Sequence, residues 1–226
     1  MITKELNKQK AEAFAEHMVE VLNNASIALM ASIGHQTGLF DTMATLPPAT
    51  SEEIAEVAGL NERYVREWLG AMVTGAIVEY DPEGCTYHLP AEHAASLTRT
   101  AGPQNIALEC QYFAMMGEVE QKIVECFHNG GGVPYDGFHR FQHLMAQDSA
   151  AVFDNALLTK VIPLIPGLSD RLDAGIDVLD VGCGSGHAMN LLALEFPASR
   201  FAGYDMMEDG IDEARKEADR RGLHNV

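Results

Sequence analysis

The stretch Ile176-Asp-Val-Leu-Asp-Val-Gly-Cys-Gly-Ser-Gly-His187 carries the most structural information in this chain of 226 residues. Ile176 to Val181 is a short apolar run interrupted only by aspartates, which is typical of a strand in a parallel sheet. Three glycines at alternate positions follow, and they let the backbone turn sharply and approach a ligand where any Cβ would collide. A helix packed on the sheet is indicated next by the apolar residues Met189, Leu191, Leu192 and Leu194. The stretch therefore predicts a strand, a binding loop and a helix N-terminus.

Charge and spacing in this loop indicate the ligand. A dinucleotide-binding loop follows the pattern G-x-G-x-x-G, whereas the third glycine here is Gly186 and His187 stands where that pattern needs glycine. Asp180 lies two residues before Gly182, and a carboxylate about 4 Å from a pyrophosphate would repel it by a few kcal/mol at an effective dielectric constant of about 20. A cationic ligand is favoured instead, and S-adenosylmethionine carries both an ammonium and a sulfonium.

Asp205 supplies a second carboxylate for the same ligand. It ends the apolar stretch Arg200 to Tyr204 and lies roughly 20 residues beyond the first glycine, where an acidic side chain can accept hydrogen bonds from ribose hydroxyls. A glycine loop with two acidic side chains therefore predicts a cofactor that carries a sugar and a positive charge.

Val178 to Gly186 and the pair Tyr204-Asp205 resemble the glycine motif and the acidic ribose motif of class I S-adenosylmethionine-dependent methyltransferases. The resemblance implies an α/β fold of the doubly wound, Rossmann-like type. It also implies that Asp180 lies near the methionyl amine, that Asp205 holds the ribose and that Met206 borders the adenine. The loop residues that would line the cofactor are Gly182, Cys183, Gly184 and Gly186.

Composition excludes several kinds of partner. The net charge is −18, and contacts with phosphates need clustered Lys and Arg, so we expect neither nucleic acid nor an anionic membrane as a partner. No apolar stretch approaches the roughly 20 residues that span a bilayer, and the N-terminus has no apolar targeting core. We expect a cytoplasmic protein without a bound metal, because the four cysteines lack C-x-x-C spacing: Cys85, Cys110, Cys126 and Cys183.

Apolar residues recur at helical spacing from Phe14 to Leu29 and predict an amphipathic N-terminal helix that continues, after a break, towards Ile33. The apolar stripe of this helix needs a partner. Many small-molecule methyltransferases that the chain resembles carry an N-terminal domain that forms dimers, so we expect a homodimer through these helices.

Residues 50–89 have the pattern of a winged helix. A capping box that begins at Thr50 opens a short helix to Gly59, a second helix runs from Asn61 to Gly75, and a hairpin over residues 76–89 follows. The charges of the second helix cancel and the hairpin tip is acidic, an arrangement that opposes contact with DNA phosphates. The resemblance to small-molecule methyltransferases implies instead that this region is a dimerisation domain.

Pro103 to Phe127 predicts one long helix with Ile106, Phe113 and neighbouring apolar residues near one face, ended by a glycine run at 130–132. A loop leading into a helix follows. Methyl transfer to a hydroxyl needs a base that removes a proton, and three side chains in this segment are candidates: Asp136, His139 and His143.

We expect three parts: a helical and winged-helix dimerisation domain over residues 1–100, bridging helices and a substrate-side region over residues 101–167, and a partial S-adenosylmethionine-binding domain over residues 168–226. From Ile176 the chain has room for two strands and two helices, whereas a domain usually needs roughly 100 to 150 residues. We therefore expect a fragment of a longer protein, whose activity on its own is in doubt.

The predicted function is methyl transfer from S-adenosylmethionine to a small-molecule acceptor at oxygen, nitrogen or carbon. The alternative is a non-catalytic winged-helix regulator or dimerisation module that keeps a vestigial cofactor loop. Binding of S-adenosylmethionine distinguishes the two functions.

Overall fold

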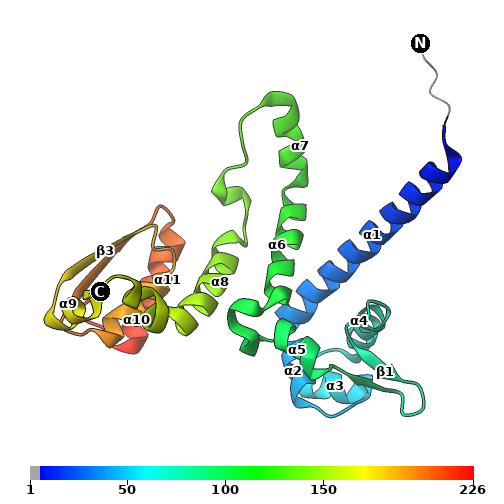
Figure 1. Cartoon of the computed structure of the whole chain (residues 1–226), viewed down its shortest axis with the longest axis horizontal. Helices are drawn as coiled ribbons and strands as arrows, with labels where there is room; N and C mark the ends of the chain where they lie inside the picture. The colour runs from blue at the N-terminus through cyan, green and yellow to red at the C-terminus, as the bar shows by residue number, and fades with distance from the viewer. Residues whose placement is uncertain (1–5) are drawn as a thin grey trace. The chain divides into compact units, whose positions relative to one another are not determined.

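The computed structural model describes residues 6–226, apart from the side chain of Asp136, and the chain forms two compact units (Figure 1). The first unit reaches to Gly117 and the second is Glu118–Val226. The predicted three-part division stays a prediction. No single helix in the described residues is long and apolar enough to cross a membrane, although the bent pair Phe141–Leu164 and Leu168–Ala174 satisfies length and composition together.

The N-terminal helix α1 (Lys8–Thr37) is continuous, so the predicted break is wrong. Asn7 caps its start and Gly38, at φ 74°, ends it. Helix α1 buries residues only near its C-terminal end, whereas the side chains of Phe14 and Leu22 are 64% and 63% exposed. The predicted apolar stripe therefore exists, and nothing in the described part of the chain covers it within the first unit.

The winged helix is confirmed. Its capping box joins Thr50 and Glu53 through two hydrogen bonds, 2.8 Å from the Thr50 amide to the Glu53 carboxylate and 3.3 Å from the Glu53 amide to the Thr50 hydroxyl. The antiparallel hairpin is shorter than predicted, with three residues in each strand. The elements are α2 (Leu39–Thr45), α3 (Ser51–Ala58), α4 (Glu62–Thr74), β1 (Glu79–Asp81), β2 (Thr86–His88) and α5 (Ala91–Leu97).

The core of the first unit forms around Trp68 of α4. The Trp68 ring meets Phe40 edge to face, with ring centroids 5.2 Å apart, and its Nε1 donates to the carbonyl of Met30 at 2.8 Å. A Cβ at Gly34 would lie 2.5 Å from the Trp68 ring, so α1 can approach α4 only with glycine there.

The long helix predicted from Pro103 to Phe127 is wrong in two respects. A 3₁₀ helix, η1 (Arg99–Gln104), contains Pro103, and Val119 separates α6 (Ile106–Glu118) from α7 (Glu120–Asn129). The face of α6 that carries Ile106 and Phe113 is exposed, and the opposite face is buried, where the Gln111 amide lies 3.0 Å from His35. The residues that α6 buries are Ala107, Leu108, Gln111 and Met115.

The second unit contains a parallel two-stranded sheet, which confirms the predicted α/β fold. Strand β3 (Asp177–Val181) pairs with β4 (Arg200–Tyr204), and helix α10 (His187–Glu195) packs against β4 (Figure 1). The remaining elements are η2 (Tyr135–Gly137), α8 (Phe141–Ala156), η3 (Leu157–Val161), η4 (Ile162–Leu164), α9 (Leu168–Ala174) and α11 (Glu208–Arg221).

Helix α10 buries Met189 and Leu192 as predicted, together with Ala193. Leu194 was predicted to pack on the sheet but is 57% exposed, because the face that carries Met189, Leu192 and Ala193 takes that place. The core of the second unit also contains Phe201 of β4, so one face of the sheet is covered.

Candidate functional site

The loop between β3 and α10 is a tight turn anchored on β4. The amides of Gly182 and Cys183 both donate to the carbonyl of Tyr204, at 2.7 and 3.2 Å. Gly182, Gly184 and Gly186 have φ values of 86°, 54° and 67°, in the left-handed region that side chains rarely adopt. A Cβ on the third of these glycines would also lie 2.6 Å from a Cβ of α11. The sequence therefore needs glycine here for the turn itself.

Asp205, directly after β4, fixes the shape of this loop. Its Oδ2 accepts a hydrogen bond from the Gly184 amide at 2.8 Å, and its Oδ1 accepts one from the Met207 amide at 2.9 Å. A carboxylate oxygen can accept two hydrogen bonds, so each oxygen of the oriented Asp205 retains capacity for a ligand hydroxyl. Sequence reasoning did not find this second role, because the contact joins residues that are distant in the chain.

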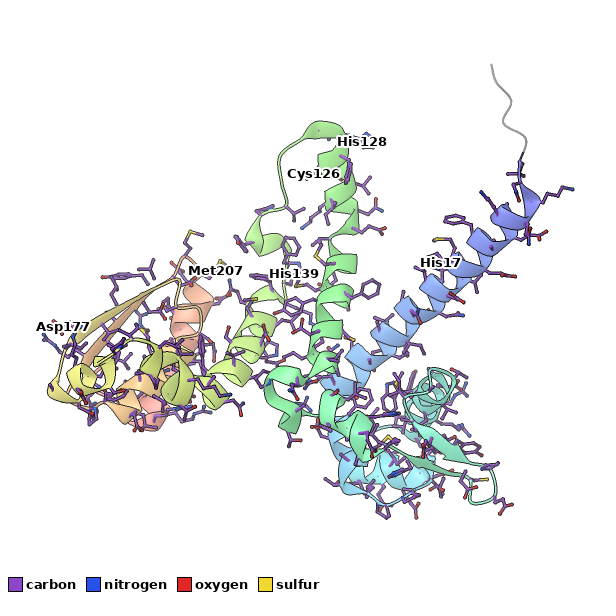
Figure 2. The ribbon with its side chains drawn as sticks, in the orientation of Figure 1. His17, Cys126, His128, His139, Asp177 and Met207 are labelled. Atoms are coloured by element: carbon purple, nitrogen blue, oxygen red, sulfur yellow. The ribbon has the colours of Figure 1, made fainter. Side chains whose placement is uncertain are left out.

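A hollow of about 660 Å³ lies beside the loop within the second unit, in the size range of small-molecule sites. Residues 180–185 and 204–207 form one wall; Met207 is labelled in Figure 2. The other wall is largely apolar, and its aromatic rings at Tyr135 and Phe141 lie 5.5 Å apart between centroids. That wall includes Tyr135, Phe141, Gln142, Met145, Ser149 and Phe153.

Helix α8 belongs to the segment that was expected to form a substrate-side region, and one of its faces lines the hollow. Gln142, Met145, Ser149 and Phe153 are spaced three or four residues apart, so they share one face of the helix. The spacing was visible in the sequence, but only the tertiary fold shows that this face lines the hollow.

The predicted cofactor residues come together at the hollow: Asp180, Gly182, Cys183, Gly184, Asp205 and Met206 line it. Gly186 ends the loop as the N-cap of α10. Asp180 makes no hydrogen bond to any residue that the structure describes. Its carboxylate is therefore available to a ligand.

Of the three predicted bases, the two histidines do not line the hollow as the predicted cofactor residues do. His139, labelled in Figure 2, and His143 are exposed and do not line the hollow. The Nε2 of His143 lies 3.0 Å from the side-chain amide of Gln147. The side chain of Asp136 lies outside the described residues. The identity of the base stays a prediction.

The electrostatic environment of the loop is anionic. Burial, followed by the charges of Asp180 and Asp205, raises the pKa of the Cys183 thiol. A thiol held in its neutral form is a poor nucleophile. In the part of the chain that the structure describes, no group of three or more His, Cys, Asp or Glu side chains is placed to hold a metal ion. The site therefore has the charge for a cationic ligand.

Two family models match the chain. The Rv2258c-like winged HTH domain matches residues 25–99, and the methyltransferase domain matches residues 172–226. The chain joins a winged helix-turn-helix domain to a methyltransferase domain. No curated protein matches the sequence significantly.

Solved structures share this fold. The mitomycin 7-O-methyltransferase MmcR is 19% identical, with a TM-score of 0.58 over 95% of this chain and 65% of its own. The O-methyltransferase NcsB1 from neocarzinostatin biosynthesis, solved with S-adenosylmethionine and 2-hydroxy-5-methyl naphthoic acid, is 18% identical, with a TM-score of 0.56 over 88% of this chain and 62% of its own. Human N-acetylserotonin methyltransferase, solved with S-adenosylmethionine, is 15% identical, with a TM-score of 0.53 over 96% and 65%. This chain thus spans less than two thirds of their length, and the likeness shows the class I methyltransferase fold.

Proposed function

We propose that the protein binds S-adenosylmethionine in the hollow and transfers its methyl group to a small-molecule acceptor. The observation that carries this proposal is the pair of carboxylates beside the glycine loop: Asp205 is oriented by two backbone amides, and Asp180 lines the hollow without a partner among the described residues. A phosphorylated ligand would meet repulsion from both carboxylates, whereas a cation is attracted.

The residues at the hollow fit this cofactor. Asp180 would pair with the methionyl amine, Asp205 would accept from the ribose hydroxyls and Met206, which is 85% exposed, would cover the adenine. Gly182 and Gly184 leave space where side chains would stand, so the backbone can approach the ligand. The cofactor supplies an electrophilic methyl group on its sulfonium.

The chain's own contribution to catalysis is mainly alignment. Methyl transfer is an in-line displacement, so the protein must hold the acceptor atom opposite the sulfonium. The apolar wall at Tyr135, Phe141 and Met145 would hold the body of a small acceptor and exclude water. A hydroxyl acceptor also needs a base, for which His139, His143 and Asp136 remain the candidates.

Calorimetry with S-adenosylmethionine tests this proposal. We expect the wild type to bind it more tightly than NADH, and Asp205→Ala to weaken binding at least about 10-fold, because both ligand and loop contacts are lost. Asp173→Ala, which removes an exposed carboxylate of α9 away from the hollow, is the matched control and should bind like the wild type. Tighter binding of NADH, or equal binding by Asp205→Ala and the control, would contradict the proposal.

The winged-helix match favours one alternative, a regulator that binds DNA. The exposed charges of α4 oppose it, because Arg63 pairs with Glu67 at 2.9 Å and Arg66 with Glu62 at 3.4 Å. The cations that would contact phosphates are thus neutralised on the same helix. A gel-shift assay with random duplex DNA should show no complex at physiological salt.

We further propose that the protein is a homodimer through α1. The exposed side chains of Phe14 and Leu22 lie on a helix that the first unit leaves uncovered over much of its length. The double variant Phe14→Glu and Leu22→Glu should sediment as a monomer, while the control Asn24→Glu, at an exposed polar position, should sediment with the wild type as a dimer. A monomeric wild type would refute the dimer.

A cytoplasmic location completes the proposal. All four cysteines are free thiols, of which Cys85 is exposed, and this suits a reducing compartment. Fractionation of the source cells should find the protein in the cytoplasm, and recovery from an oxidising compartment would contradict this location.

A further inference from the structure

A hydrogen bond joins the two walls of the hollow. His187 is the first residue of α10, and its Nε2 lies 2.7 Å from Oδ1 of Asp154, in the last turn of α8. The two side chains are 19% and 55% exposed. We propose that this pair, the α8–α10 latch, holds α8 against the glycine loop and thereby sets the affinity for the cofactor. The proposal rests on the proposed function, since it concerns the same hollow.

Helix α8 packs against α10, and the latch adds a polar contact near the C-terminal end of α8. Leu144, near the start of α8, is its one fully buried residue, whereas six of its residues line the hollow. Asp154 lies near the other end of the helix. Its neighbour Phe153 both lines the hollow and packs against the core of the second unit. A shift of Asp154 would therefore move Phe153 and change the shape of the wall.

The direction of the hydrogen bond in the latch follows from its chemistry. A carboxylate only accepts hydrogen bonds, so the Nε2 of His187 carries the hydrogen and donates it to Asp154. The positive N-terminal end of α10 also attracts the Asp154 carboxylate, so this acceptor suits the start of a helix.

The latch sets the fraction of molecules in which α8 is positioned for ligand binding. The loop would carry the cofactor contacts and α8 closes the opposite side of the hollow, so the cofactor is enclosed only when both walls are in place. Apparent affinity falls in proportion to the fraction of molecules with α8 in position. His187 and Asp154 are in this sense positioning residues.

Calorimetry with S-adenosylmethionine tests the latch through three variants. Asp154→Ala should bind about 10-fold more weakly than the wild type, because it leaves the His187 donor without its acceptor. Asp154→Asn keeps an oxygen acceptor at the same place and should restore binding to within about 3-fold of the wild type. Asp173→Ala removes a carboxylate remote from the hollow and should change nothing.

Hydrogen exchange of residues 141–156 without ligand gives a second readout. Asp154→Ala should exchange faster there than Asp173→Ala, and Asp154→Asn should exchange like the wild type. The latch is refuted if Asp154→Ala matches Asp173→Ala in both affinity and exchange, as a solvated surface pair would. A wild type that fails to bind S-adenosylmethionine refutes the proposed function instead, and exchange alone then decides whether the latch holds α8.

Discussion

The two domains begin key helices in opposite ways. In the winged helix, α3 starts at Thr50 with a capping box, so side chains of Thr50 and Glu53 satisfy the backbone amides at its end. In the methyltransferase domain, α10 starts at Gly186 with no side-chain cap. The first amides of a helix have no partner within the helix, so a cap supplied by the protein closes the end, whereas a bare glycine start leaves donors for a ligand. At α10 the uncapped start adjoins the glycine loop that lines the hollow.

The largest expected effect comes from a substitution at Gly186, the uncapped start of α10. Gly186→Val places a branched side chain at φ 67° and within 2.6 Å of a Cβ in α11, so loop and helix cannot keep their positions. We expect loss of S-adenosylmethionine binding by at least about 100-fold, measured by calorimetry. The matched control is Gly70→Ala in α4, where nothing lies within 4 Å of an added Cβ and binding should be unchanged. Binding by Gly186→Val at wild-type affinity would remove the distinction between the two helix starts.

A smaller effect should follow from removing the side-chain cap of α3. Thr50→Ala removes the hydroxyl that accepts from the Glu53 amide at 3.3 Å, and loss of an N-cap costs about 1 kcal/mol. Chemical denaturation followed by Trp68 fluorescence measures this loss, because Trp68 lies in the core of the first unit. Affinity for S-adenosylmethionine should not change, and a matching drop in affinity would show that the capped helix also serves the ligand.

The smallest effect concerns pH and the buried His35 of the first unit. Burial, followed by the charge of Arg99, lowers the pKa of His35 below the ordinary histidine value of 6.5, while Asp41 opposes the shift. The unfolded chain therefore binds a proton that the folded chain does not, and stability falls as the pH drops below about 6.5. The Nδ1 atom of His35 lies 3.0 Å from the side-chain amide nitrogen of Gln111. The Gln111 amide can donate a hydrogen bond to Nδ1 only while Nδ1 carries no proton.

Thermal melts at pH 7.5 and pH 5.5 measure this dependence. The wild type should lose stability on acidification, and His35→Asn, which keeps an acceptor but does not titrate, should lose less. An equal loss in both proteins would assign the pH dependence to other groups.

Local patterns in the sequence predicted both helix starts. Thr50 with Glu53, Asn61 and the glycines of the loop act through neighbours in the chain, so their effects could be read directly. The strand Arg200–Tyr204 was placed for the same reason, since its apolar run is short and bounded.

Tertiary effects were not visible at this level. Val119 separates α6 from α7, and Gly117, which was placed within the predicted long helix, lies two residues before this break. The apolar residues of α6 did not reveal its buried face, because Gln111, a polar residue, lies inwards beside His35. The wall formed by α8 depends likewise on how that helix lies beside the loop. Periodicity gives the faces of a helix, but not which face meets a site.

Asp205 has two roles, since it would bind the ribose and it also accepts hydrogen bonds from the Gly184 and Met207 amides. Loss of Asp205 would disturb the loop even in a homologue that bound no ligand, because the Gly184 and Met207 amides would lose their acceptor. Asp180 has no such duty towards the described residues. In homologues that have lost ligand binding, we therefore expect substitution at Asp180 before substitution at Asp205. The residue at position 180 is thus the informative one for separating active from inactive homologues.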